Sequence, residues 1–200
     1  LAGTIPNCVS YDPTFAHEVG VIMQHGLKRM VEKQENVYYY ITLLNENYPM
    51  PGLKAGTEEQ IIKGMYLCKE GPQLKTTVQL LGSGTILRES IAAQALLEQD
   101  WGIAANVWSC PSFNELAREG QDCERWNLLH PTEGPRVSFV SQQLEPYSGP
   151  VVASTDYIKA FADQIRPFIP KGRTYKVLGT DGFGRSDFRS KLREHFEVNR

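Results

Sequence analysis

One stretch, residues 76–99, constrains the fold more than any other part of the sequence. It begins with an apolar run at residues 78–81, continues through Gly82-Ser83-Gly84, and then places apolar residues at helical spacing as far as Leu96. This order predicts a strand, a tight turn and a helix, because glycine lets the backbone reverse without a Cβ clash. Such a unit starts a parallel sheet, so the sequence predicts an α/β protein.

The glycine turn has two interpretations. The free amides of the first helical turn and the helix dipole both favour an anion there, which would suit a nucleotide-sensing domain that uses Gly82 to Gly84. A lone Gly-x-Gly without the third glycine of the dinucleotide motif is more typical of a structural turn, in which Ser83 or Thr85 accepts hydrogen bonds from those amides.

The first third of the chain predicts half of another α/β unit. Residues 1–11 are expected to be irregular, and Asp12-Pro13 is expected to cap a helix over residues 14–30, where apolar residues recur at steps of three and four. Residues 36–44 are rich in β-branched and aromatic side chains and predict a strand buried on both faces. Prolines and glycines at 45–56 mark a linker, where we place a domain boundary.

Strands and helices are expected to alternate through the rest of the chain. Strands are predicted at residues 64–68 (an edge strand), 104–109, 136–144, 151–153 and 175–178, and helices at 114–118, 122–130, from Ser154 or Thr155 to 166, and from Ser186 to 196. Gly120 is expected to separate the helices on either side of it. The predicted fold is a mostly parallel sheet with helices on both faces, preceded by the end of a second α/β domain.

Charge and cysteine usage exclude several functional classes. The 21 basic and 23 acidic residues nearly balance, and no block of like charges indicates a nucleic-acid or membrane partner. No apolar run approaches the roughly 18 residues that cross a bilayer, and no signal peptide opens the chain. The four cysteines lie far apart, which favours reduced thiols in a cytoplasmic protein.

Residues that carry catalytic chemistry elsewhere form weak patterns here. The four histidines, His17, His25, His130 and His195, lack metal-ligand spacing, and Ser83 lacks the Gly-x-Ser-x-Gly spacing of a nucleophile elbow. Four carboxylates cluster around Gly120, namely Glu115, Glu119, Asp122 and Glu124. Such a cluster could act in acid–base chemistry, but it is more often a solvated helix face.

The segment TDGFGRSD at residues 180–187 is chemically the most distinctive. Asp181, Gly182, Gly184 and Arg185 follow a predicted strand, at the edge of the sheet where α/β proteins commonly place their sites. These four residues are therefore a candidate contact for an anion or an acidic partner. The alternative is a structural turn that Asp181 closes, with Arg185 paired to Asp187 or to a neighbouring subunit.

Several longer stretches carry a resemblance to a known family. They are LAGTIPNC at residues 1–8, KQENVYYYI at 33–41 with LNENY at 44–48, GQDCERWN at 120–127, VASTDY at 152–157 and LGTDGFGRSD at 178–187. Together they closely resemble the homodimeric bacterial pyruvate dehydrogenase component, a member of the transketolase-like superfamily. The resemblance covers essentially the whole chain.

That resemblance implies a thiamine-diphosphate enzyme that decarboxylates pyruvate and passes the acetyl group to the lipoyl domain of a dihydrolipoyl acetyltransferase. It implies that residues 1–48 end the domain on the pyrimidine side of the cofactor, that 49–56 are a linker, and that 57–200 are a C-terminal domain lacking its extreme end. Thiamine diphosphate and magnesium would be held upstream of Leu1, so no catalytic, cofactor-binding or metal-binding residue is assigned here.

Because the chain begins at Leu1 and not at methionine, we expect a fragment of a longer polypeptide. Alone it should be inactive, and within the parent enzyme it should serve dimer packing and assembly of the complex. A non-catalytic assembly module is the alternative from a different class.

Overall fold

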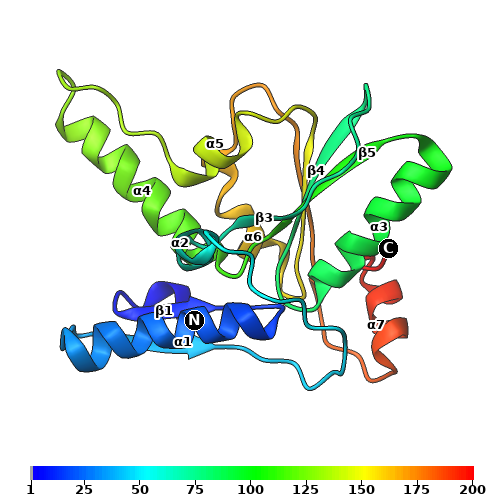
Figure 1. Cartoon of the computed structure of the whole chain (residues 1–200), viewed down its shortest axis with the longest axis horizontal. Helices are drawn as coiled ribbons and strands as arrows, with labels where there is room; N and C mark the ends of the chain where they lie inside the picture. Colours follow the sequence, from blue (N-terminus) through cyan, green and yellow to red (C-terminus); the bar gives the residue numbers. More distant parts are fainter. Residues whose placement is uncertain (1) are drawn as a thin grey trace.

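The computed structural model describes residues 2–200. Leu1, from which we expect a fragment of a longer polypeptide, lies outside the described residues. The chain forms two sheets, a two-stranded one near the N-terminus and a five-stranded one in the middle of the molecule (Figure 1). In the larger sheet one edge strand is antiparallel and the other strands are parallel. The predicted α/β class with a mostly parallel sheet is confirmed.

Residues 2–48, called the N-terminal unit below, contain the smaller sheet. Its elements are η1 (Ala2–Thr4), β1 (Cys8–Tyr11), α1 (Ala16–Leu27), a π-helical extension η2 (Lys28–Glu32) and β2 (Tyr38–Ile41). The strands run parallel, with Cys8 opposite Tyr38. The prediction of an irregular segment was wrong for β1, because four residues without alternation carry no strand signal, and pairing with β2 and packing against the C-terminal domain hold them extended.

Two further expectations for this unit were wrong. Strand β2 is not buried on both faces, since Tyr38 and Tyr40 lie exposed on the face opposite α1. Asp12-Pro13 does not cap α1. The helix starts after Phe15, and the Glu18 carboxylate accepts the amide protons of Thr14 and Phe15 from inside the first turn.

The larger sheet has the strand order β3-β5-β4-β6-β7. Its strands are β3 (Tyr66–Lys69), β4 (Thr77–Gly82), β5 (Ala104–Ser109), β6 (Val151–Ser154) and β7 (Tyr175–Leu178), and the short helix α2 (Glu58–Lys63) precedes β3. The crossover from β4 to β5 runs through α3 (Ile86–Trp101), as residues 76–109 predict. Strand β3 pairs antiparallel with β5 and forms one edge, which confirms the predicted edge strand.

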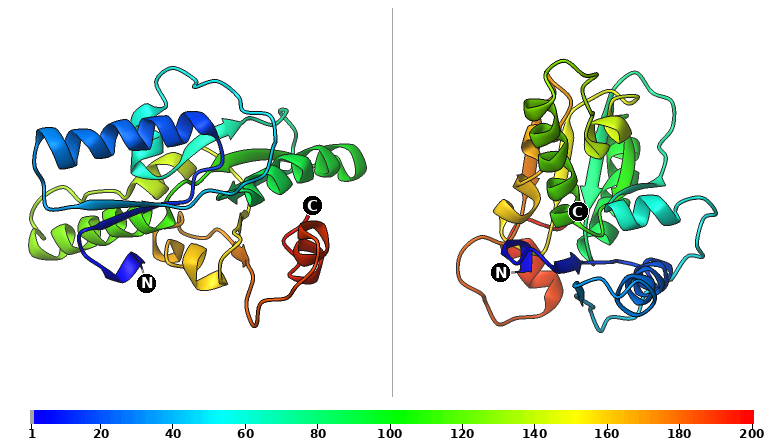
Figure 2. Two further views of the ribbon diagram at one scale, coloured as in Figure 1. Left: turned by 90° about the horizontal axis from the view of Figure 1, so that it is seen from below. Right: turned by 90° about the vertical axis from the view of Figure 1, so that its left-hand side faces the viewer.

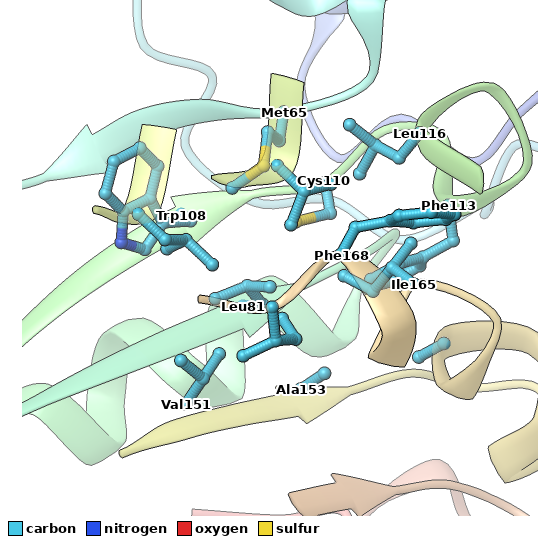
Figure 3. Packing of buried hydrophobic residues seen from close by; sticks show 14 of the residues in the cluster. Met65, Leu81, Trp108, Cys110, Phe113, Leu116, Val151, Ala153, Ile165 and Phe168 are labelled. Atoms are coloured by element: carbon cyan, nitrogen blue, oxygen red, sulfur yellow. The ribbon is translucent and has the colours of Figure 1, made fainter. Parts of the chain in front are cut away.

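Alternation along the strands builds two hydrophobic layers. Val78 and Leu80 of β4 face α3, where they pack with Leu87. Leu81 and Trp108 face the opposite side, where they pack with Phe113 and Leu116 of α4 and with Ile165, which follows α6 (Figure 3). Each fully buried leucine or phenylalanine contributes about 1.5–3 kcal/mol relative to exposure, so these layers hold the sheet between its helices.

Helix boundaries on the second face correct several predictions. Helix α4 (Phe113–Leu129) is one helix, not two, and Gly120 lies inside it because a Cβ there would stand 2.5 Å from the Phe168 ring. Close packing of α4 on that ring outweighs the helix-breaking tendency of glycine.

Residues 139–144 form helix α5 (Phe139–Leu144) and not a strand, because the Ser138 hydroxyl accepts the amide proton of Ser141 and starts a helix.

The last helices are shorter than predicted. Residues beyond Ser154 form α6 (Lys159–Asp163) and the 3₁₀ turn η3 (Arg166–Phe168), which leaves Tyr157 and Ile158 outside the helix. Helix α7 (Arg189–His195) begins after Phe188, and not after Ser186, and no side chain caps its first turn. In Figures 1 and 2, α7 lies beside α3 at the end of the chain.

Candidate functional site

The carboxyl end of β4 is the point at which the strand order of the larger sheet reverses. Strand β5 follows on one side of β4 and β6 lies on the other. Open α/β sheets commonly bind ligands outside the strand ends at such a point. Here the turn Gly82-Ser83-Gly84 occupies this position, as the sequence predicts, and the N-terminal unit is packed directly against it.

Backbone and side-chain contacts attach the N-terminal unit to the turn. The Gly84 amide donates a 2.9 Å hydrogen bond to the Asp12 carbonyl, and the Thr14 hydroxyl donates one of 2.5 Å to the Gly84 carbonyl. The Asp12 carboxylate lies over Gly84, where a Cβ would stand 2.6 Å from Asp12 Oδ2. Gly84 has a φ of +51°, which favours glycine. The place that an external anion would take beside this turn thus holds a carboxylate of the chain itself.

Asp12 is half-buried and poorly neutralised. Its Oδ1 accepts a 2.8 Å hydrogen bond from the Thr42 hydroxyl, whereas the enclosed Oδ2 has no hydrogen-bond partner among residues 2–200. Burial raises the pKa of Asp12 to about 6, although hydrogen bonds from Thr42 and Ser83 act in the opposite direction. A carboxyl with this pKa at a strand end is the kind of group that functional sites use.

Glu18 is the second carboxylate at this junction and is completely buried. Its Oε2 accepts the amide protons of Thr14 and Phe15 at 2.5 and 2.9 Å, and its Oε1 accepts hydrogen bonds from Tyr66 of β3 at 2.7 Å and Ser109 of β5 at 2.5 Å. All of its acceptor directions are occupied by protein donors. Glu18 therefore holds α1 against the larger sheet through these hydrogen bonds, and its oxygens have no free lone pair for a metal or a substrate.

Beside Asp12 a cleft of about 830 Å³ opens between the N-terminal unit and the β6–α6 segment. Residues from η1, β1, β2, α4 and α6 line it, among them Tyr40, Thr42, Asn114 and Tyr157. Burial, and then the charge of Asp12, raises the pKa of the Tyr157 hydroxyl. Sequence analysis did not single out this cleft, because its walls come from segments more than a hundred residues apart.

The predicted contact at residues 181–185 forms an exposed turn after β7. The exposed Asp181 carboxylate accepts the Lys159 amide proton at 2.8 Å and lies 3.5 Å from the Lys159 ammonium. Gly182 has a φ of +98°. Gly184 and Arg185 line a hollow of about 290 Å³ with Arg189 and Arg193.

Arg185 makes no hydrogen bond or ion pair within the described part of the chain, so the expected pairing with Asp187 is absent there. A role of this turn in anion or partner binding remains a prediction.

An ion-pair network that sequence analysis missed joins the linker to two helices. Glu46 pairs with Arg88 of α3 at 2.9 Å and with Arg193 of α7 at 3.2 Å, and Arg193 also pairs with Glu89. The pKa of Glu46 is lowered overall. Partial burial acts to raise it, but the hydrogen bonds and charges of Arg88 and Arg193 together outweigh burial. The network ties the start of the linker to the C-terminal domain.

Other candidate groups are not brought together. Over residues 2–200, no three His, Cys, Asp or Glu side chains are grouped where they could hold a metal ion. Of the carboxylates around Gly120, Glu115 pairs with Arg118 and Glu119 accepts the Phe139 amide proton, so these two stabilise helices. Among the same residues, no helix has the length and apolar character needed to span a membrane.

Comparison with known proteins adds evidence independent of this geometry. The family model described as the transketolase-like C-terminal domain matches residues 64–199, and that described as the pyruvate dehydrogenase E1 component middle domain matches residues 1–51. The structure is similar to transketolase from Leishmania mexicana, with a TM-score of 0.63 and 17% identity over 99% of this chain and 24% of that one. At this identity the likeness shows the fold alone.

Curated relatives are much closer in sequence. The pyruvate dehydrogenase E1 component of Cupriavidus necator is 62% identical over 98% of this chain, and that of Escherichia coli K12 is 58% identical over 98%. The chain spans 22% of the length of each of these two relatives. Since the family model of the transketolase-like C-terminal domain covers residues 64–199, the chain belongs to the family of transketolase-like C-terminal domains, and along nearly its whole length it is similar to pyruvate dehydrogenase E1 components.

Proposed function

We propose that this chain is part of a thiamine-diphosphate-dependent enzyme that decarboxylates pyruvate and transfers the acetyl group to the lipoyl domain of a dihydrolipoyl acetyltransferase. Identity of 58–62% to pyruvate dehydrogenase E1 components, extending over 98% of the chain, carries the proposal. We further propose that the enzyme is a cytoplasmic homodimer within a multienzyme complex, and that the domain boundary lies at residues 49–56.

The residues of this chain do not fit the metal and diphosphate of the cofactor. Magnesium prefers oxygen ligands with free lone pairs, and the fully buried Glu18 already accepts four hydrogen bonds. Asp12, the other carboxylate at the junction, stands alone beside tyrosines and Thr42. Thiamine diphosphate and magnesium are therefore assigned to parts of the enzyme outside residues 1–200, and the chain alone should be inactive.

The contribution of this segment is packing and assembly. The N-terminal unit exposes large apolar side chains on α1, η2 and the segment after β2, namely Met23, Leu27, Val31, Leu43 and Leu44. A parallel sheet of two strands is normally extended and covered on both faces, so this surface suits further parts of the enzyme or a second subunit. A non-catalytic assembly module remains the second candidate, and the same exposed surface favours it.

Two measurements test the proposal. The longer enzyme containing this chain should release carbon dioxide from pyruvate with thiamine diphosphate and magnesium, and should acetylate a lipoyl domain. Calorimetry on the 200-residue chain should detect no magnesium-dependent cofactor binding. A full-length enzyme without decarboxylase activity would overturn the enzymatic assignment, and cofactor binding by the short chain would overturn the placement of the site.

A further inference from the structure

The cleft beside Asp12 has the lining of a site for an organic cation. Among the described residues that line this cleft, Asp12 is the only Asp, Glu, Lys or Arg, so the charge of the lining is a single carboxylate. Aromatic rings form much of the remaining wall, contributed by Tyr11, Tyr38, Tyr40, Tyr157 and Phe161. Aromatic faces attract cations, and a carboxylate next to them adds a direct charge.

The Asp12 carboxylate makes no ion pair with a basic side chain among the described residues. Oδ2 of Asp12 is enclosed beside Gly84 without a hydrogen-bond donor, Oδ1 accepts the Thr42 hydroxyl proton at 2.8 Å, and a hydrogen bond from Ser83 also favours the ionised form. The acidic side chains Asp156 and Glu18 also act on Asp12 and disfavour its ionised form. A buried or half-buried carboxylate usually has a charged or hydrogen-bonding partner, so Asp12 stands out as under-neutralised.

The size and chemistry of the cleft define the ligand class. A volume of about 830 Å³ lies within the range of roughly 300–1,000 Å³ that holds small molecules. Asn114 and Gln164 add amide groups, and Ile158, Ala160 and Phe161 add apolar surface. A compact cationic head on an apolar stem matches this combination.

We propose that the cleft between the N-terminal unit and the β6–α6 segment binds a guanidinium or primary ammonium group, with Asp12 as its counter-ion and tyrosine rings around it. The group belongs either to a free small molecule or to an arginine or lysine side chain from another part of the enzyme. Cation binding here does not depend on the enzymatic activity proposed above.

Titration calorimetry at pH 7.5 tests the site with n-butylguanidinium, n-butylammonium and the neutral analogue n-butylurea. The two cations should bind saturably and the urea at least about tenfold more weakly, because a charge-assisted hydrogen bond is worth a factor of that order. Asp12→Asn, which keeps the volume, should weaken cation binding at least about tenfold. Asp100→Asn, a matched control at an exposed position on α3 outside the cleft lining, should keep the affinity within about twofold.

Two further measurements keep the test decisive if Asp12→Asn does not fold. Tyr40→Leu removes an exposed ring from the wall and should weaken cation binding several-fold. Affinity should also fall as pH drops below about 6, because protonated Asp12 carries no charge. Equal binding of the urea and the cations, unchanged binding in both Asp12→Asn and Tyr40→Leu, or no saturable binding at all would overturn the proposal.

The source of the cation follows from repeating the titration on the longer enzyme. Binding of n-butylguanidinium by both proteins indicates a free small-molecule ligand. Binding by the 200-residue chain alone indicates that a cationic side chain of the longer polypeptide fills the cleft.

Discussion

The Tyr66 hydroxyl, on the edge strand β3, donates a 2.7 Å hydrogen bond to Glu18 Oε1 at the start of α1. Burial, and next the Glu18 charge, raises the pKa of this hydroxyl, so it stays protonated and able to donate around neutral pH. His17 contacts the same hydroxyl through Nε2 at 3.1 Å and the Pro51 carbonyl through Nδ1 at 2.9 Å. One hydroxyl thus links helix, sheet and linker.

Replacing Glu18 by glutamine should lower the free energy of unfolding by about 3 kcal/mol. The amide NH₂ cannot accept a hydrogen bond, so two of the buried donors that now bind the carboxylate would lose their acceptor. Tyr66→Phe removes one donor and should lower it by about 1–2 kcal/mol. Urea denaturation measures both, with the exposed Glu98→Gln as the control that changes little. A Glu18→Gln variant as stable as the control would contradict the role of Glu18 in joining α1 to the larger sheet.

Asp12 should make stability depend on pH in a definite direction. Its folded pKa of about 6 lies above the ordinary value of 3.8, so ionisation disfavours the folded state as pH rises through that window. The stability of Asp12→Asn relative to the parent should therefore increase by about 2–3 kcal/mol between pH 4 and pH 7. Denaturation curves of both proteins at the two pH values check this, and a difference that moves the other way refutes the assignment.

Gly84→Ala should lower the free energy of unfolding by about 2–4 kcal/mol, because the methyl group meets the Asp12 carboxylate at a positive φ. Gly20→Ala is the matched control. It places a methyl group in open space within α1 and should stabilise the protein by about 0.5–1 kcal/mol. In the double variant Asp12→Ala/Gly84→Ala, part of the loss should be recovered, and strict additivity would show that the two sites do not touch.

Limited proteolysis should cut first within residues 49–56, all of which are exposed. The preceding residues are held, since Glu46 pairs with three arginines and the Tyr48 hydroxyl donates to the Thr14 carbonyl. Mass spectrometry of the first fragments locates the cut. Glu46→Ala should extend cutting toward residue 45, whereas first cuts inside residues 76–110 would show that the linker prediction is wrong.

Arg185→Ala in the longer enzyme should spare cofactor binding and weaken assembly, because this exposed side chain makes no ion pair within residues 2–200 and stands between the exposed Phe183 and Phe188. Sedimentation measures the assembly, and calorimetry measures cofactor affinity. Lys176→Ala, an exposed change on β7, is the control. Lost cofactor affinity with intact assembly would reverse the interpretation of this turn.

Local patterns in the sequence were sufficient for the centre of the fold. The strand, glycine turn and helix of residues 76–99 follow from hydrophobic periodicity and from the backbone freedom of glycine, both of which act within a few residues. The same reasoning located β5, β6 and β7 and the edge strand β3, whose antiparallel direction only the structure shows. It also located the turn at residues 82–84, for which a structural role was the favoured interpretation and an anion site the alternative.

Only the tertiary structure decided that the Asp12 carboxylate lies against Gly84 and how the two parts of the chain join. Asp12 and Thr14 reach a glycine 70 or more residues away, and Glu18 meets Ser109 across 91 residues. Gly120 stays within α4 because Phe168 packs against it. Such choices depend on packing and hydrogen bonding between distant segments, which propensity and spacing do not encode.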